Sequence, residues 1–161
     1  MARRDNAVTG AAGVHYVAYV LNMMGYAVQL TAVGFPGVDL IATNPKTGST
    51  VSIQVKTSRD AWQKRKNDSD SHWRWRGFKK ADTLQKQKYL YALVALQEEG
   101  EMEQLTDIFI VPSSVVVKTI TAPNSGWSPG WFGFQDSKCG DWRGERGLRL
   151  IRKQLGDLPQ D

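Results

Sequence analysis

The sequence predicts a single α/β domain in which helices flank a mostly mixed β-sheet. Two observations support this fold class: a helical apolar pattern near the N-terminus precedes a run of short strand patterns, and a strong turn signal joins two of those strands. The chain has 161 residues and shows no repeat or linker, so one domain is expected over residues 1–161.

The first half of the chain has the clearest patterns. Apolar residues at helical spacing predict a helix over 7–24 that Gly25 would end. Strands are expected over 27–33, 38–43 and 50–58, and the last shows clean apolar–polar alternation. The turn signal at residues 44–48 makes the second and third of these strands an antiparallel hairpin.

The second half mixes strand and helix patterns. The expected elements are, in order, a short strand at 73–76, a buried strand at 89–96, an exposed turn at 98–101, a short strand at 108–111, a helix at 112–120, a Gly-, Pro-, Ser- and Trp-rich loop at 121–140 and a short helix at 148–155. Trp127, Trp131 and Trp142 are expected to anchor the long loop by packing.

The charge distribution points to a polyanionic partner. The chain carries 21 Lys and Arg against 16 Asp and Glu, and residues 54–88 hold 11 of the basic and 4 of the acidic residues. Such a concentration suits nucleic acid first, with a solvated basic face as the alternative. The expected contacts in this segment are Arg59, Lys64, Arg65, Lys66, Trp73, Arg74, Trp75 and Arg76. The alternating Trp and Arg residues suit stacking on unpaired bases, or a core position for the tryptophans with solvated arginines.

Several function classes are not expected. With one cysteine, Cys139, and two histidines, the chain cannot form an internal disulfide or a zinc site of Cys and His ligands. No histidine lies near Cys139 in sequence, so a thiol enzyme is not expected. The chain has no glycine-rich phosphate-binding loop, so an NTPase is not expected. The absence of a long apolar run and of a signal-peptide pattern predicts a soluble, cytoplasmic protein with no membrane partner.

The predicted hairpin collects three polar side chains. A turn centred between residues 47 and 48 places Asp39 opposite Lys56, so that Asp39, Gln54 and Lys56 share one face of the sheet. A slip by a whole residue pair would preserve that face. The apolar residues expected on the other face are Val38, Leu40, Ile53 and Val55. An exposed face with a cross-strand Asp–Lys pair would also explain the pattern.

The two strands of this hairpin resemble a known nuclease superfamily. The stretches Gly37-Val38-Asp39-Leu40-Ile41-Ala42 and Ile53-Gln54-Val55-Lys56-Thr57-Ser58 resemble the two half-motifs of the PD-(D/E)XK, or restriction-endonuclease-like, superfamily, in the variant with Gln in place of the second acid. The resemblance covers about residues 10–60 well, including the preceding helix, and extends more loosely to the strands near residues 89–96 and 109–112.

The resemblance implies a restriction-endonuclease-like core and Mg²⁺-dependent, or Mn²⁺-dependent, phosphodiester cleavage, in DNA rather than RNA. Asp39, the side-chain oxygen of Gln54 and the backbone carbonyl of Val55 would hold the metal, which suits the preference of Mg²⁺ for oxygen ligands. Lys56 would position or deprotonate the attacking water. A homodimer is also possible, because family members that cut both strands often dimerise.

The first helix departs from the family pattern. Many members carry a glutamate there, whereas this chain has no Glu before Glu98 and has His15 at the matching position. His15 could be a ligand better matched to Mn²⁺, a general base, or a histidine with only a structural role. Because Asp39 would be the single charged ligand, the alternative function is a catalytically inactive domain that binds nucleic acid or a protein partner.

Overall fold

The computed structural model describes residues 2–32, 35, 37–67, 71–78, 89–99, 103–123, 126–156 and 158, with backbone alone for 2–5, 97–99 and 103–105. Residues 68–70 and 79–88 of the basic segment lie outside the described residues. Among the described helices, none combines the length and apolar character needed to cross a membrane.

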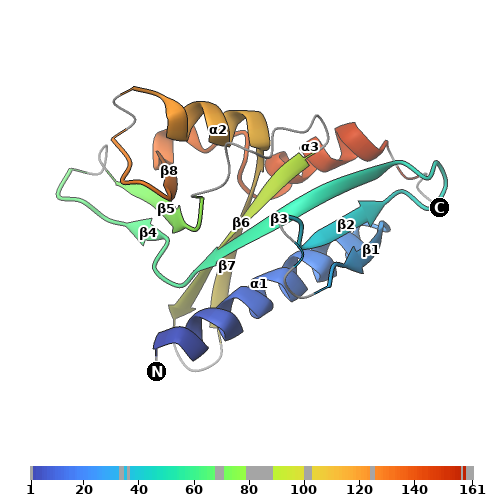
Figure 1. Ribbon diagram of the computed structural model, residues 1–161, viewed down its shortest axis with the longest axis horizontal. Coiled ribbons are helices and arrows are strands. Elements are labelled where there is room, and N and C mark those ends of the chain that lie inside the picture. The colour runs from blue at the N-terminus through green and yellow to red at the C-terminus, as the bar shows by residue number, and fades with distance from the viewer. Residues whose placement is uncertain are drawn as a thin grey trace.

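Five strands form the main sheet in the order β1-β2-β3-β6-β7 (Figure 1). Their bounds are β1 Ala27–Leu30, β2 Leu40–Thr43, β3 Thr50–Ser58, β6 Tyr89–Glu99 and β7 Glu103–Pro112. β3 and β6 run parallel, and every other neighbouring pair is antiparallel. The expected mixed sheet is therefore confirmed.

A second, three-stranded antiparallel sheet was not predicted. It consists of β4 Trp62–Gln63, β5 His72–Arg76 and β8 Trp131–Gln135, with β5 in the middle. The described α-helices are α1 Ala2–Met23, α2 Ser113–Thr121 and α3 Gly144–Leu155, and a 3₁₀ helix spans Asp136–Lys138. The expected loop over 121–140 is thus wrong, since it contains β8 and the 3₁₀ helix.

The main sheet separates two apolar cores. On one face, α1 and α3 pack on buried residues that include Leu40, Ile53 and Val94. On the other face, the small sheet and α2 pack on residues that include Leu93 and Phe109. Figure 1 shows this arrangement, with α1 below the sheet and β4, β5, β8 and α2 above its left half. Both faces of β6 are covered, which explains why Tyr89–Leu96 is continuously buried.

Several element bounds differ from the predictions. α1 begins at residue 2 rather than 7, and α3 begins at 144 rather than 148. β6 and β7 are longer than their apolar runs because their antiparallel ladder continues from Leu90–Pro112 to Glu99–Glu103. The turn expected at 98–101 is wrong in its first half, since Glu98 and Glu99 belong to β6; the rest lies outside the described residues.

The β2–β3 hairpin keeps the predicted faces but not the predicted register. Leu40 pairs with Ile53, so Asp39, one residue before β2, lies level with Gln54 rather than with Lys56. This slip of one residue pair leaves Leu40, Ile53 and Val55 in the core beneath α1. Val38 is the exception: it precedes the strand and packs against the opposite core.

Candidate active site

Asp39 lies at the point where the pairing of β2 with β3 ends. Its backbone N–H donates to the Ile53 carbonyl at 2.9 Å, and its carboxylate Oδ2 accepts the Val55 N–H at 2.7 Å. The N–H and C=O of one strand residue point to the same side. The Val55 carbonyl therefore points toward the edge where Asp39 lies, and the second carboxylate oxygen of Asp39 can bind a cation there.

Gln54 projects from the same side of β3 and contacts Tyr89 of β6. The Tyr89 hydroxyl lies 2.9 Å from Gln54 Oε1 and also contacts the Gly37 carbonyl, just before Asp39. Burial raises the pKa of the Tyr89 hydroxyl, which stays protonated and can donate to either oxygen. Tyr89 thus joins Gln54 to the segment that carries Asp39, a role that the sequence patterns did not reveal.

Lys56 lies on the same face, beneath the end of β5. Its Nζ is 5.7 Å from the centre of the Phe78 ring, and a Cβ on Gly77 would come within 3.2 Å of Nζ. Burial lowers the pKa of Lys56, while the negative charge of Asp39 opposes that shift. The structure therefore brings Asp39, Gln54 and Lys56 together. It also favours the uncharged form of the Lys56 amine more than exposure to water would.

The donor set at this face fits a hard divalent cation. It offers one carboxylate, one amide oxygen and one backbone carbonyl, all oxygen donors of the kind that Mg²⁺ accepts together with several waters. Within the described part of the chain, no three His, Cys, Asp or Glu side chains are grouped closely enough to hold a metal. Asp39 would thus be the single charged ligand, as the sequence predicts.

His15 does not belong to this group of side chains. Gly13 and Val17 of α1 are buried, and Gly13 lies directly against Thr57 of β3. His15 is two residues from each, which rotates it by about 200° around the helix. It is exposed accordingly, and α1 covers the sheet face opposite Lys56. The expectation that His15 faces the metal is wrong.

A cavity of about 510 Å³ extends from the end of β3. Thr9 of α1, Ser58 and Arg59 after the Lys56 position, and Arg76 and Trp131 of the small sheet line it. Arg59 and Arg76 line this cavity together with Asp60, whereas Asp39, Gln54 and Lys56 are not among its described lining residues. Trp131 is a lining residue that the sequence assigned to packing alone.

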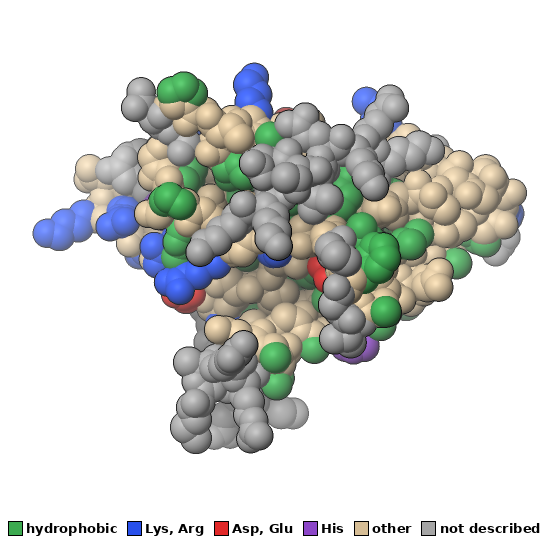
Figure 2. All heavy atoms as spheres, in the orientation of Figure 1, with side chains coloured by type: hydrophobic (Ala, Val, Ile, Leu, Met, Phe, Trp, Pro, Cys, Tyr) green, Lys and Arg blue, Asp and Glu red, His purple; other side chains and the backbone are tan. Residues whose placement is uncertain are grey.

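The basic segment divides into a surface part and a core part. Lys64, Arg65 and Lys66 are exposed, and Figure 2 shows Lys and Arg side chains gathered at the left of the molecule, over β4 and β5. Trp73 and Trp75, in contrast, are 3% and 1% exposed and pack between the two sheets. Their predicted contact with nucleic acid is therefore wrong, because β5 turns its arginines outward and its tryptophans inward.

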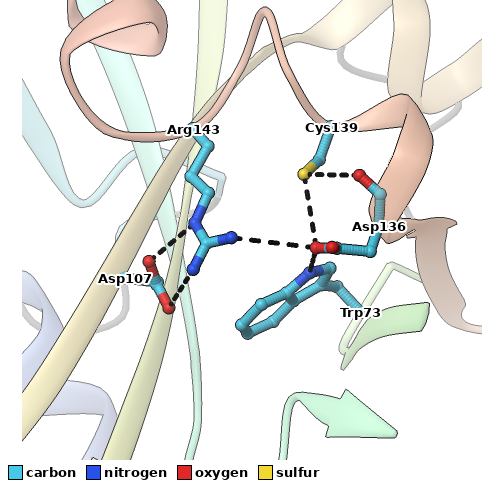
Figure 3. A network of polar contacts seen from close by, with 5 residues as sticks. All are labelled: Trp73, Asp107, Asp136, Cys139 and Arg143. Atoms are coloured by element: carbon cyan, nitrogen blue, oxygen red, sulfur yellow. Dashed lines mark hydrogen bonds and ion pairs between the residues drawn. The ribbon is translucent and has the colours of Figure 1, made fainter. Parts of the chain in front are cut away.

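Figure 3 shows the polar network that joins the small sheet to the main sheet. Arg143 makes two hydrogen bonds to Asp107 of β7, of 2.8 and 3.0 Å, and lies 3.8 Å from Asp136. Asp136 in turn accepts the Trp73 Nε1–H at 2.7 Å. Burial raises the pKa of the neighbouring Cys139 thiol to about 11, so its nucleophilic thiolate is scarce near neutral pH.

Comparison with known proteins supports the fold rather than the chemistry. No protein-family model matches the chain, and no curated protein matches it. Among solved structures, that of a bacterial homing endonuclease, I-Ssp6803I, superposes with a TM-score of 0.57 over 92% of each chain, at 13% sequence identity. The chain has a restriction-endonuclease-like fold. The fold class expected from the sequence is confirmed.

Proposed function

We propose that this protein is a metal-dependent endonuclease that hydrolyses phosphodiester bonds in DNA. The observation that carries the proposal is the convergence of Asp39, Gln54 and Lys56 on one face of the β2–β3 hairpin, within a restriction-endonuclease-like fold. The similarity to a protein described as a homing endonuclease supports DNA as the substrate.

The proposed chemistry is in-line attack of water on phosphorus. Asp39, Gln54 and the Val55 carbonyl would hold Mg²⁺ or Mn²⁺, which supplies charge neutralisation and a more acidic bound water. Lys56 accepts the proton of the attacking water, and its lowered pKa suits it to this step. The new bond joins the water oxygen to phosphorus, the bond to the leaving oxygen breaks, and that oxygen takes a proton from solvent.

The test is cleavage of supercoiled plasmid with Mg²⁺, Mn²⁺ or chelator. The wild-type chain should nick or linearise the plasmid only with metal, and Asp39→Ala and Lys56→Ala should each abolish cleavage while retaining the folded state. Wild-type cleavage that persists in chelator, or a fully active Lys56→Ala, would refute the proposed site.

The single carboxylate favours a second candidate function, an inactive domain that binds nucleic acid. This candidate predicts binding without cleavage under any metal. In both cases the exposed cations should contact phosphates, so log affinity should fall linearly with log salt. Charge reversal of the exposed set should weaken binding and flatten that slope; the set is Lys64, Arg65 and Lys66.

A further inference from the structure

The outer face of the small sheet carries a second cavity, of about 770 Å³. It lies on the side of β5 and β8 that faces away from the core. Because side chains alternate along a strand, Arg74 and Arg76 emerge on this face while Trp73 and Trp75 are buried. Opposite them on β8, Trp131 pairs with Arg76 and Gly133 pairs with Arg74. The face therefore presents cations and an aromatic ring side by side.

Gly133 gives this face its hollow shape. A Cβ at this position would overlap the Trp73 carbonyl and the ring of Trp127. Trp127 therefore packs directly over the backbone of β8, where any larger residue would exclude it. Its ring also meets His72 edge-on, with centroids 5.5 Å apart. Trp127 and Trp131 both line the cavity, on segments that are adjacent in sequence.

Arg74 and Arg76 on this face are held in place by one aromatic ring, that of Trp131. The guanidinium carbons of Arg74 and Arg76 lie 4.8 and 4.3 Å from the centre of the Trp131 ring. A guanidinium stacked on a ring keeps its N–H groups free to bind phosphate at its edges. Arg65 and Lys138 also line the cavity, and among its described lining residues there is no Asp or Glu. An anionic ligand with a flat apolar part fits these properties.

The cavity shares Trp131 with the smaller one at the end of β3, which Thr57 and Ser58 also line. β5 ends at Arg76, next to Gly77, where an added Cβ would lie 3.2 Å from Lys56 Nζ. At about 3.3 Å per strand residue, Arg74 is about 10 Å along the strand from Gly77. Trp131, which pairs with Arg76, therefore lies near the end of β5 that approaches Lys56.

We infer that this cavity binds an unpaired nucleobase of the substrate strand, stacked on Trp131 and Trp127, with the adjacent phosphate on Arg74. The inference rests on the proposed nuclease function and narrows its substrate. Stacking needs a base that is not engaged in a duplex, so the preferred substrate carries single-stranded nucleotides next to the cleaved bond.

The decisive measurement compares two strands that have the same phosphates but differ in their bases. Fluorescence anisotropy in chelator would measure the affinity of the intact chain for a labelled single strand of about ten nucleotides, and for an abasic strand of equal length. The wild-type chain should bind the base-bearing strand about tenfold more tightly or better. Equal affinity for the two strands would overturn the inference, and this outcome needs no variant.

Variants locate the effect. Trp127→Ala should reduce affinity for the base-bearing strand about tenfold and leave affinity for the abasic strand unchanged. Trp131→Ala should cause the same loss of base preference and also lower affinity for the abasic strand, because Trp131 holds Arg74 in place. Arg74→Ala should weaken binding of the base-bearing strand and of the abasic strand. Tyr19→Ala, which removes an exposed aromatic ring from α1, is the matched control and should change neither. If both tryptophan variants keep the wild-type preference for bases, the cavity is not the stacking site.

Different results would refute the proposed nuclease function and the proposed base-binding cavity. Binding in chelator requires no catalysis, whereas plasmid cleavage requires no preference for unpaired bases. A chain that cuts plasmid but binds abasic and base-bearing strands equally has the proposed activity without this site. A chain that prefers bases through Trp131 and Trp127 but cuts no DNA with any metal has this site without the proposed activity.

Discussion

Removal of the Tyr89 hydroxyl should affect the stability of the fold and the metal dependence of the site by different amounts. Tyr89 is 2% exposed, and its hydroxyl lies 2.9 Å from Gln54 Oε1 while contacting the Gly37 carbonyl. Tyr89→Phe keeps the ring and creates almost no void, but it removes the donor of these partly buried oxygens. Such a loss costs about 0.5–1.5 kcal/mol of unfolding free energy.

The same hydroxyl should matter more to the metal than to the fold. Groups that orient a metal ligand typically contribute about 10- to 100-fold to metal affinity or activity. If Tyr89 orients Gln54 toward the cation, Tyr89→Phe should shift the Mg²⁺ dependence of plasmid cleavage to higher concentration by about that factor. The assay is the initial nicking rate as a function of Mg²⁺ concentration, paired with urea unfolding of the same sample.

Tyr26 provides a matched control. It is also buried, and its hydroxyl donates to the Gly156 carbonyl at 3.1 Å, remote from Lys56 and Gln54. Tyr26→Phe should lower stability by a similar amount and leave the Mg²⁺ dependence of the folded fraction unchanged. If the two variants have the same Mg²⁺ dependence, Tyr89 is a structural tyrosine and the reasoning about Gln54 is refuted.

Three further outcomes follow from the geometry. Lys56→Met should slow cleavage at least about 100-fold without lowering the melting temperature, because burial disfavours the ammonium form of Lys56. Lys46→Met, on the same hairpin, is the control. A large loss of stability in Lys56→Met would contradict this reasoning. His15→Ala should change the cleavage rate less than about twofold and stability by less than about 0.5 kcal/mol, because His15 is exposed; a rate loss of tenfold or more would return it to the site. The free energy of unfolding should fall between about pH 9 and pH 11, where the Cys139 thiol ionises in the unfolded chain but not in the folded one. Cys139→Ala should lack this contribution to the pH dependence, which is up to about 1.4 kcal/mol per pH unit. Equal pH dependence in wild type and Cys139→Ala would show that the thiol is accessible.

The sequence predicted the β2–β3 hairpin well because both of its signals are local. Alternation along residues 51–55 determines which side chains enter the core, and a shift by one residue pair cannot change that. The register itself depends on Asn44, which is fully buried. Its amide donates to the Leu155 carbonyl at 3.0 Å, and its Oδ1 accepts the Lys46 N–H at 2.9 Å. These contacts to α3 and within the turn centre the hairpin one residue earlier than the turn signal suggests.

The small sheet could not be predicted because its strands depend on distant partners. Residues 131–135 lie within a stretch rich in Gly, Pro, Ser and Trp, and they form a strand by pairing with β5, about sixty residues earlier. The pattern at 73–76 predicted opposite faces for Trp and Arg and left both base stacking and a core position open for the tryptophans. The structure has the core position, in the cluster that Phe132 and Phe134 complete. Once β8 is in place, the proposed base-binding surface is at Trp131 rather than at Trp73 and Trp75.

His15 fails for a related reason. A helix position can be matched to a family pattern by counting residues, but the side that faces the sheet is determined by packing. Here the buried positions are Thr9, Gly13, Val17 and Leu21, so the helix turns its one histidine to solvent. An acid two residues along the helix from a buried position would have been equally remote from Lys56. The missing glutamate is therefore not replaced by His15.

The charge balance of the proposed site then links metal binding to DNA binding. Asp39 is the single charged ligand of the proposed site, which leaves little negative charge to attract a divalent cation. Bound DNA would add a phosphate beside Asp39 and supply anionic oxygens that the protein lacks. Metal and DNA would each raise the affinity of the site for the other by the same factor, as linkage requires. A nuclease built in this way can keep a weak metal site in the free protein and complete it only on its substrate.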